Sequence, residues 1–182
     1  SEIMLADGVK LVLLATDRAG YGNLSALITL GRRNAIKGSY SLSLDDVRDG
    51  LPGCLALLLP DPLPSLAQAQ QVAAVFPERS WLAVELFRAV DDAERLSRLA
   101  ELSEAVGLPL VAAGDVHMHA AERRALQDTL TAIRIGVPVS DAGAALYPNA
   151  ERHLREFADL ASLYPPELLE QTVAIAERCH FS

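Results

Sequence analysis

Residues 81–113 read WLAVELFRAVDDAERLSRLAELSEAVGLPLVAA, and this stretch decides the fold class. The run Trp81–Phe87 is apolar apart from one acidic residue, which is typical of a buried strand. Asp91–Val106 places its apolar residues at helical spacing, and Gly107 is a common helix end. Pro109–Ala113 is a second apolar run of strand length. A strand, a helix and a strand in this order favour an α/β fold with parallel strands covered by helices.

The same alternation continues on either side of this stretch. Val9–Ala15 and Cys54–Leu59 are apolar runs that predict two further strands. A turn signal at Gly20–Asn23 predicts the beginning of a helix. The other helical patterns cover Leu24–Leu30, Ser65–Phe76 and Glu122–Ile135. Because a closed parallel barrel needs about eight strands, the four predicted ones indicate a partial β/α barrel.

The C-terminal part of the chain differs in character from the rest. A helix capped by Asn149 is expected to reach about Ala161, and a last helix is expected over Pro165–Cys179. We expect residues 1–140 to form the partial α/β barrel and residues 141–182 to form a helical extension. The chain begins without Met, directly before a predicted strand, so we expect it to be a piece of a larger protein.

Composition and charge exclude several functional classes. The 182 residues include 16 Lys and Arg against 24 Asp and Glu, giving a net charge of −8, whereas a domain that grips DNA phosphates is usually basic. No apolar run approaches the ~20 residues of a transmembrane helix, so no membrane partner is expected. Cys54 and Cys179 are too few for a disulfide framework, which favours a reducing, cytoplasmic compartment.

The densest polar cluster, Gly114–His119, directly follows the predicted strand Pro109–Ala113. In α/β folds, ligands and catalytic groups gather at the carboxyl ends of parallel strands. If the segment is extended, Asp115, His117 and His119 point to one side, because the side-chain period of a strand is two. A carboxylate and imidazoles can ligate a divalent ion such as zinc or manganese. The alternative is a solvated loop with two incidental histidines, since the pattern is short.

Glu85 is a further candidate, because it lies within an apolar run where an unpaired carboxylate would be costly to bury. Its side chain either faces the same carboxyl-end cavity or forms an ion pair with an arginine on a covering helix. His153, in contrast, is expected to be solvated on a polar helix over Glu151–Glu156.

The order of motifs along the chain resembles that of one family. Leu11–Leu24 is similar to the segment of bacterial C-family DNA polymerases in which a strand leads into a Gly-Tyr-x-Asn-Leu helix. Asp49–Ala56 resembles their next strand, and Gly107–His119 is the most specific stretch. The other matching stretches are Arg124–Arg134, Tyr147–Leu154 and Tyr164–Leu169. Together these stretches resemble the polymerase-and-histidinol-phosphatase (PHP) domain of that family. The sequence Gly-Asp-Val-His-Met-His at residues 114–119 is similar to that of the error-prone, damage-tolerant branch.

The resemblance implies a distorted seven-stranded β/α barrel of the PHP type, of which this chain would be a part. Family members with complete sites bind a cluster of divalent metal ions, and they can act as phosphoesterases or as proofreading 3′–5′ exonucleases. The family's last ligand motif is Asp-x-His, which carries over a role as zinc or manganese ligands to Asp115 and His117. His119 is a weaker candidate, because its position is not the usual ligand, and Glu85 is another weaker one.

The chain departs from the family pattern at the other ligand positions. The first ligands, a His-x-His and the next His and Asp or Glu residues, are absent from the sequence. We expect the chain to start just after them. A histidine expected shortly after Glu85 is also absent, since residues 86–90 contain none. We therefore expect a degraded metal site in a domain that serves as a scaffold, with no catalytic residue in this chain.

The first functional hypothesis is a piece of the PHP domain of an error-prone DNA polymerase. The parent enzyme would transfer nucleotides to a primer during lesion bypass, with magnesium ions held in a domain outside this chain. The piece itself is expected to contact the rest of the polymerase chain and to meet DNA only through it. Accessory damage-tolerance proteins are further candidate partners. The alternatives are a metal-dependent phosphoesterase of the histidinol-phosphatase type, a proofreading exonuclease, or a non-catalytic interaction module.

Overall fold

The computed structural model describes residues 1–180 of the chain. Their internal contacts divide them into two compact units, which are described separately. The first unit is built from Ser1–Val84, Ala93–Ala112 and the C-terminal segment that begins at Glu167. The second unit is built from Glu85–Asp92 and Ala113–Pro166. Each unit therefore combines segments that are far apart in the sequence.

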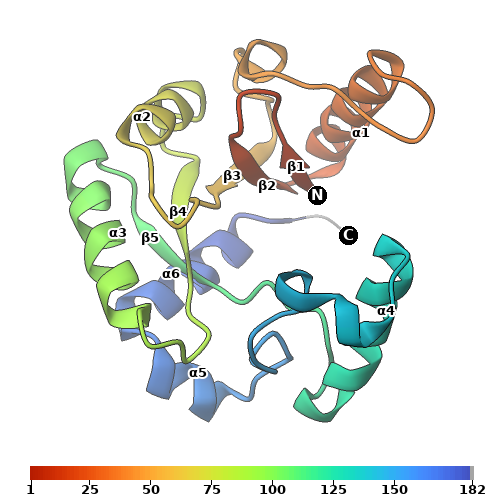
Figure 1. Ribbon diagram of the computed structural model, residues 1–182. Helices are drawn as coiled ribbons and strands as arrows, with labels where there is room; N and C mark the ends of the chain where they lie inside the picture. Colours follow the sequence, from red (N-terminus) through yellow and green to blue (C-terminus); the bar gives the residue numbers. More distant parts are fainter. Residues whose placement is uncertain (181–182) are drawn as a thin grey trace. The chain divides into compact units, whose positions relative to one another are not determined.

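Within residues 1–180, five strands form one open sheet in the order β1-β2-β3-β4-β5 (Figure 1). The strands are β1 (Glu2–Met4), β2 (Lys10–Ala15), β3 (Cys54–Leu58), β4 (Ser80–Glu85) and β5 (Leu110–Ala113). The α/β class expected from the sequence is confirmed. A PHP-type barrel is not confirmed, because the sheet of the described residues is not closed.

Two of the strand pairs are antiparallel, which corrects the expectation of parallel strands. β1 and β2 form a hairpin with Ile3 opposite Leu11, and β2 pairs with β3 with Leu13 opposite Ala56. β3 and β4 are parallel, as expected. The apolar runs of β3 and β4 reflect burial on both faces of the sheet, and burial of this kind does not fix strand direction.

Most helices fall close to the predicted segments, and the differences lie at the beginning of α1 and in the second unit. They are α1 (Arg18–Arg33), α2 (Leu66–Val75), α3 (Asp92–Val106), α4 (Arg124–Ile135), α5 (Phe157–Leu163) and α6 (Pro166–Glu177), with short 3₁₀ turns η1 (Leu44–Val47), η2 (Ala121–Arg123), η3 (Val139–Asp141) and η4 (Gly143–Ala145). Ser65 caps α2, and Gly136 ends α4 in the left-handed conformation that glycine favours. No helix among the described residues combines the length and the apolar character needed to cross a bilayer.

Helix α1 begins earlier than the sequence pattern predicts. Asp17 is its N-cap, and the Asp17 carboxylate accepts a hydrogen bond from the Gly20 amide at 2.8 Å. The Gly20–Asn23 stretch is thus part of the helix and not a turn before it. A Cβ atom at Gly20 would lie 1.9 Å from the Gly53 carbonyl oxygen, so glycine is needed here for close packing.

Helix α6 completes the core of the first unit. Leu55, Trp81, Val111 and Ile175 form a buried cluster that joins three strands to this helix. The Trp81 indole Nε1 also donates a hydrogen bond to Gln171 Oε1 at 2.9 Å. The C-terminal helix is therefore an integral part of this unit.

The second difference among the helices is the segment after Tyr147, where a helix capped by Asn149 was expected and α5 begins only at Phe157. The Asn149 amide instead donates to the Phe87 carbonyl at 2.7 Å, and its Oδ1 accepts from the Glu151 amide at 3.1 Å. An asparagine side chain can satisfy the backbone in this way without a helix. His153 consequently lies on an isolated bridge opposite Met118, and the expected polar helix around it is wrong.

Candidate functional site

The polar segment after β5 brings two of its three candidate residues together. Asp115 has a φ of +39°, so the segment is irregular there and not extended as the pattern assumed. His117 Nε2 nevertheless lies 3.1 Å from Asp115 Oδ1. The exposed His119 borders a hollow beside α4 that His117 also lines, together with Arg123 and Leu126. The structure thus brings Asp115 within hydrogen-bond distance of His117, and it places His119 beside His117 at the same hollow.

Arg152 is the main partner of Asp115 in the second unit. Its guanidinium forms an ion pair with Asp115 Oδ2. The guanidinium carbon also lies 3.8 Å from the centroid of the Phe87 ring and 4.3 Å from that of Tyr147. The face of an aromatic ring attracts a cation. Asp115, Phe87 and Tyr147, which lie on three separate segments, therefore all attract this arginine.

Tyr147 also contacts the histidine of the pair. Its hydroxyl oxygen lies 2.8 Å from His117 Nε2, and the two ring centroids are 5.1 Å apart. Arg124, at the beginning of α4, donates hydrogen bonds to the carbonyls of Tyr147 and Pro148 and so fixes this segment. His117 Nε2 therefore faces two oxygen atoms of the chain itself.

Backbone hydrogen bonds hold the same two segments together. The amides of His117 and Met118 donate to the Arg152 carbonyl at 2.9 and 3.0 Å. The Leu154 amide donates in return to the Met118 carbonyl at 3.0 Å. The side-chain cluster is thus built on a short ladder between residues 117–118 and 152–154.

Glu85, at the end of β4, lies near a second network centred on Tyr164. The Tyr164 hydroxyl donates to the Ala113 carbonyl at 2.6 Å and accepts from the Leu86 amide at 3.1 Å. Burial raises the pKa of Tyr164, the Leu86 hydrogen bond and Arg155 lower it, and the negative charge of Glu85 adds to the increase. Glu85 therefore lies close enough to Tyr164 for its charge to act on the phenol.

The arrangement does not fit a resident metal ion as it stands. Within residues 1–180, no group of three or more His, Cys, Asp or Glu side chains is placed to hold one. Asp115 Oδ2 faces the Arg152 guanidinium, and a guanidinium has no lone pair to offer a metal. Metal ligation by Asp115 and His117 stays a prediction that only a binding experiment can test.

Three residues of this cluster were missed by sequence reasoning: Phe87, Tyr147 and Arg152. Tyr147 and Arg152 belong to a stretch that carries the family resemblance, but nothing in their spacing indicates contact with Asp115. The one sequence signal for these two residues was that they lie in a stretch similar to a known family. Their convergence depends on hydrogen bonds between distant segments, which local patterns do not contain.

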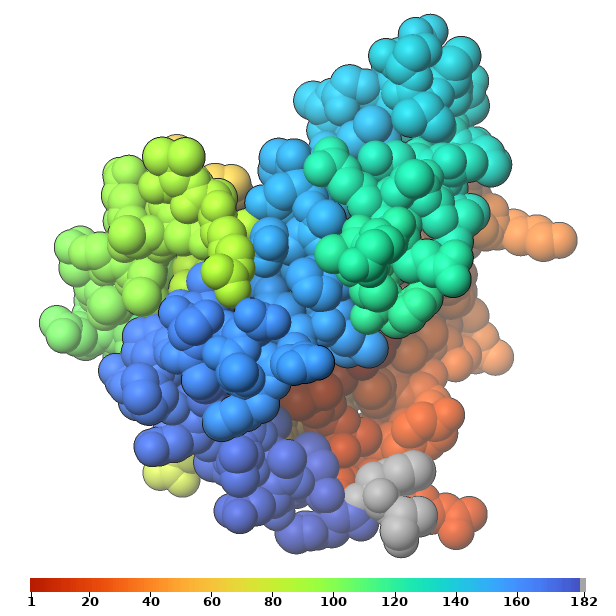
Figure 2. Space-filling view, turned by 90° about the horizontal axis from the view of Figure 1, so that it is seen from below, coloured from red at the N-terminus to blue at the C-terminus, as the bar shows by residue number. Residues whose placement is uncertain are grey.

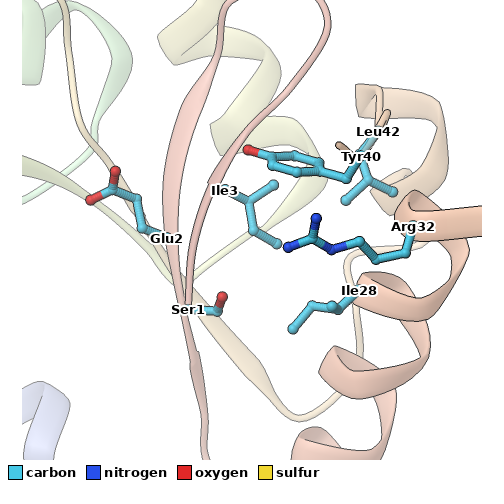
Figure 3. A pocket seen from close by; sticks show the side chains of 7 residues that line it. All are labelled: Ser1, Glu2, Ile3, Ile28, Arg32, Tyr40 and Leu42. Carbon is cyan, nitrogen blue, oxygen red and sulfur yellow. The ribbon is translucent and has the colours of Figure 1, made fainter. Parts of the chain in front are cut away.

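A pocket in the first unit is a second place where a ligand could be considered (Figure 3). It is lined by Ser1, Glu2, Ile3, Ile28, Arg32, Tyr40 and Leu42. The Tyr40 hydroxyl accepts a hydrogen bond from the Met4 amide, and Arg32 lies 5.7 Å from the Tyr40 ring. Glu2 points away from Arg32 and pairs with Lys10. The pocket thus lacks a grouping of acid, base and nucleophile.

Comparison with known proteins gives the chain its relatives. No protein-family model matches it. The chain is 55% identical to the error-prone DNA polymerase of Dechloromonas aromatica, 56% to that of Azoarcus sp. and 54% to that of Pseudomonas aeruginosa. All of the chain is matched, but it spans only 18% of the length of each of these relatives. The resemblance to error-prone DNA polymerases is therefore confirmed: over its whole length the chain is similar to a segment of proteins with that name.

Proposed function

We propose that the chain is a structural part of an error-prone DNA polymerase, corresponding to a portion of its PHP domain. The observation that carries the proposal is the match of the whole chain to 18% of the length of proteins with that name. The polymerase itself would synthesise DNA in damage tolerance, with magnesium held in parts outside this chain.

The contacts of Asp115 favour a structural over a catalytic role. A metal-dependent phosphoesterase needs protein ligands around an open position where water binds the metal. Asp115 is engaged by Arg152, and His117 by Asp115 and Tyr147. These side chains are partners of one another, which supports a role in holding segments together.

The surface of α4 supports contact with the rest of the polymerase chain. Leu126, Leu130 and Ile133 are 53%, 53% and 70% exposed, whereas the buried residues of this helix are Thr131 and Ala132. The surface of this region is visible in teal in Figure 2. An apolar stripe of this kind usually meets another protein surface. Since most of the relatives' length lies outside this chain, the remainder of the polymerase is the occupant that we propose.

The net charge of −8 favours DNA contact through other parts of the polymerase. Accessory damage-tolerance proteins remain candidate partners of the whole enzyme. The rival functions are a phosphoesterase and a proofreading exonuclease, both of which would use zinc or manganese.

An activity assay distinguishes these functions. The chain, and the polymerase that contains it, would be incubated with Mn²⁺, Zn²⁺ or Mg²⁺ and a 3′-labelled primer or a phosphomonoester. We expect no hydrolysis by the chain, and no change in the exonuclease activity of the polymerase on Asp115→Asn. Asp141→Asn, at an exposed position of the same unit, is the matched control. Hydrolysis that is lost in Asp115→Asn and retained in Asp141→Asn would contradict the proposal.

A further inference from the structure

We propose that the guanidinium of Arg152 is the resident cation of the Asp115–His117 pair. In this view, the positive charge that a metal ion would bring to the Asp115 carboxylate is supplied by the chain itself. The inference deepens the structural role proposed above and rests on it. It makes Arg152 a positioning residue, since it acts by holding Asp115 and the segment that carries His117.

The surroundings of Arg152 are those of a bound cation. The Asp115 carboxylate faces it, and the rings of Phe87 and Tyr147 lie 3.8 and 4.3 Å from the guanidinium carbon. The Arg152 and Asp115 side chains are only 18% and 21% exposed, so water screens their attraction less than at the surface. A planar guanidinium suits a position over aromatic rings better than a hydrated metal ion does.

The main chain of Arg152 reinforces the placement of its side chain. Its carbonyl accepts the amide hydrogen bonds of His117 and Met118. Asp115, in turn, has a positive φ, which aspartate tolerates better than most residues. Arg152 therefore holds the same loop by charge and by backbone, and a metal ion would have to displace it from Asp115 and from both rings.

The chemistry of a guanidinium separates this site from a catalytic metal centre. An arginine keeps its charge over the whole physiological pH range and donates hydrogen bonds only. It neutralises the carboxylate but does not lower the pKa of a bound water as a zinc ion does. The cluster therefore orders the loop and provides no activated water.

The first test is a double-mutant cycle on the thermal unfolding of the 182-residue chain. Arg152→Met keeps the length of the side chain and removes its charge, and Arg134→Met, at an exposed position of α4, is the control. We expect Arg152→Met to lower the midpoint by about 4 °C or more, and Arg134→Met to leave it unchanged. Adding Asp115→Asn to Arg152→Met should cost little more. Strictly additive losses, or equal effects of the two arginine variants, would overturn the inference.

The second test measures binding of Mn²⁺ alone, which a purely structural role would not alter. Free Mn²⁺ would be counted by its paramagnetic resonance signal in the wild type, Arg152→Met and Arg152→Lys. We expect no Asp115-dependent binding by the wild type or Arg152→Lys, and measurable binding by Arg152→Met, because the Asp115 carboxylate then lacks its guanidinium partner. Stoichiometric wild-type binding that Asp115→Asn abolishes would overturn the inference, as would a folded Arg152→Met that binds no better than wild type.

The outcomes keep this inference and the proposed function apart. Hydrolysis that depends on Asp115 would refute the structural role. Absence of hydrolysis, together with an Arg152→Met variant that behaves like Arg134→Met, would refute only the role of Arg152.

Discussion

At the scale of single residues, the Tyr164 hydroxyl links two segments of the second unit that are far apart in the sequence. Its hydroxyl joins the Ala113 carbonyl to the Leu86 amide. Tyr164→Phe leaves both groups without this partner, and loss of a buried hydrogen bond costs about 1–3 kcal/mol. Chemical denaturation should show this loss, with Val90→Ala, at an exposed site of the same unit, as the control. Equal stabilities of the two variants would mean that the Tyr164 hydroxyl is dispensable.

The raised pKa of Tyr164 also predicts a dependence of stability on pH. The folded state keeps the phenol protonated at a pH where the unfolded chain releases the proton, so the unfolded state binds fewer protons there. The free energy of unfolding should therefore fall as the pH rises above about 10, the ordinary pKa of tyrosine. Unfolding measured between pH 8 and about 11 should show a smaller decline in Tyr164→Phe than in wild type. An identical decline in both would contradict the assignment.

The residues of the candidate site show what the sequence could and could not provide. Asp115 and His117 are only two positions apart, so they stay close although the segment is not extended as the pattern assumed. Arg152 and Phe87 reach Asp115 from segments that are distant in the chain. No periodicity relates such residues, because the contact is created by the fold. The sequence therefore predicted the pair but not the cation that engages it.

At the scale of elements, the close approach of α1 to the turn at Gly53 predicts opposite effects for two glycine substitutions in the same helix. Gly20→Ala places a methyl group against the Gly53 carbonyl, and the turn must shift to admit it. Gly22→Ala, in the same helix, meets nothing within 4 Å and should stabilise by about 0.5–1 kcal/mol, because alanine favours a helix. Thermal unfolding should thus shift in opposite directions for the two variants. A shift in the same direction would show that the helix does not pack on Gly53 in solution.

Element boundaries were predictable where a local signal decides them. Ser65 begins α2 with its side chain, and Gly136 ends α4 through its backbone conformation. The prediction failed at Asn149, whose amide binds a carbonyl far along the chain. The prediction of strand direction also failed, because the segment that joins two buried strands can lead to a parallel or to an antiparallel pair. Local chemistry fixes element ends, and long-range contacts decide how the elements are joined.

At the scale of the whole molecule, substitutions in the apolar stripe on α4 should affect association with other proteins and leave the stability of the chain nearly unchanged. Ile133→Ser removes exposed apolar surface, so the unfolding midpoint of the chain should change little. Binding of a hydrophobic dye should fall, and association with the remainder of the polymerase should weaken. Thr129→Ser, an exposed substitution elsewhere on α4, is the control. A large loss of stability in Ile133→Ser would mean that this side chain is buried in the isolated chain.

The order in which the chain is made has a consequence for the first unit. The Trp81 indole in β4 donates its hydrogen bond to Gln171, and Ile175 from the same helix completes its cluster. During synthesis the second unit, which ends at Pro166, can collect all its segments earlier. The five-stranded sheet, although mostly translated first, must wait for α6 to leave the ribosome. Its exposed apolar surface therefore makes the nascent chain, more than the finished protein, the form that would need a chaperone.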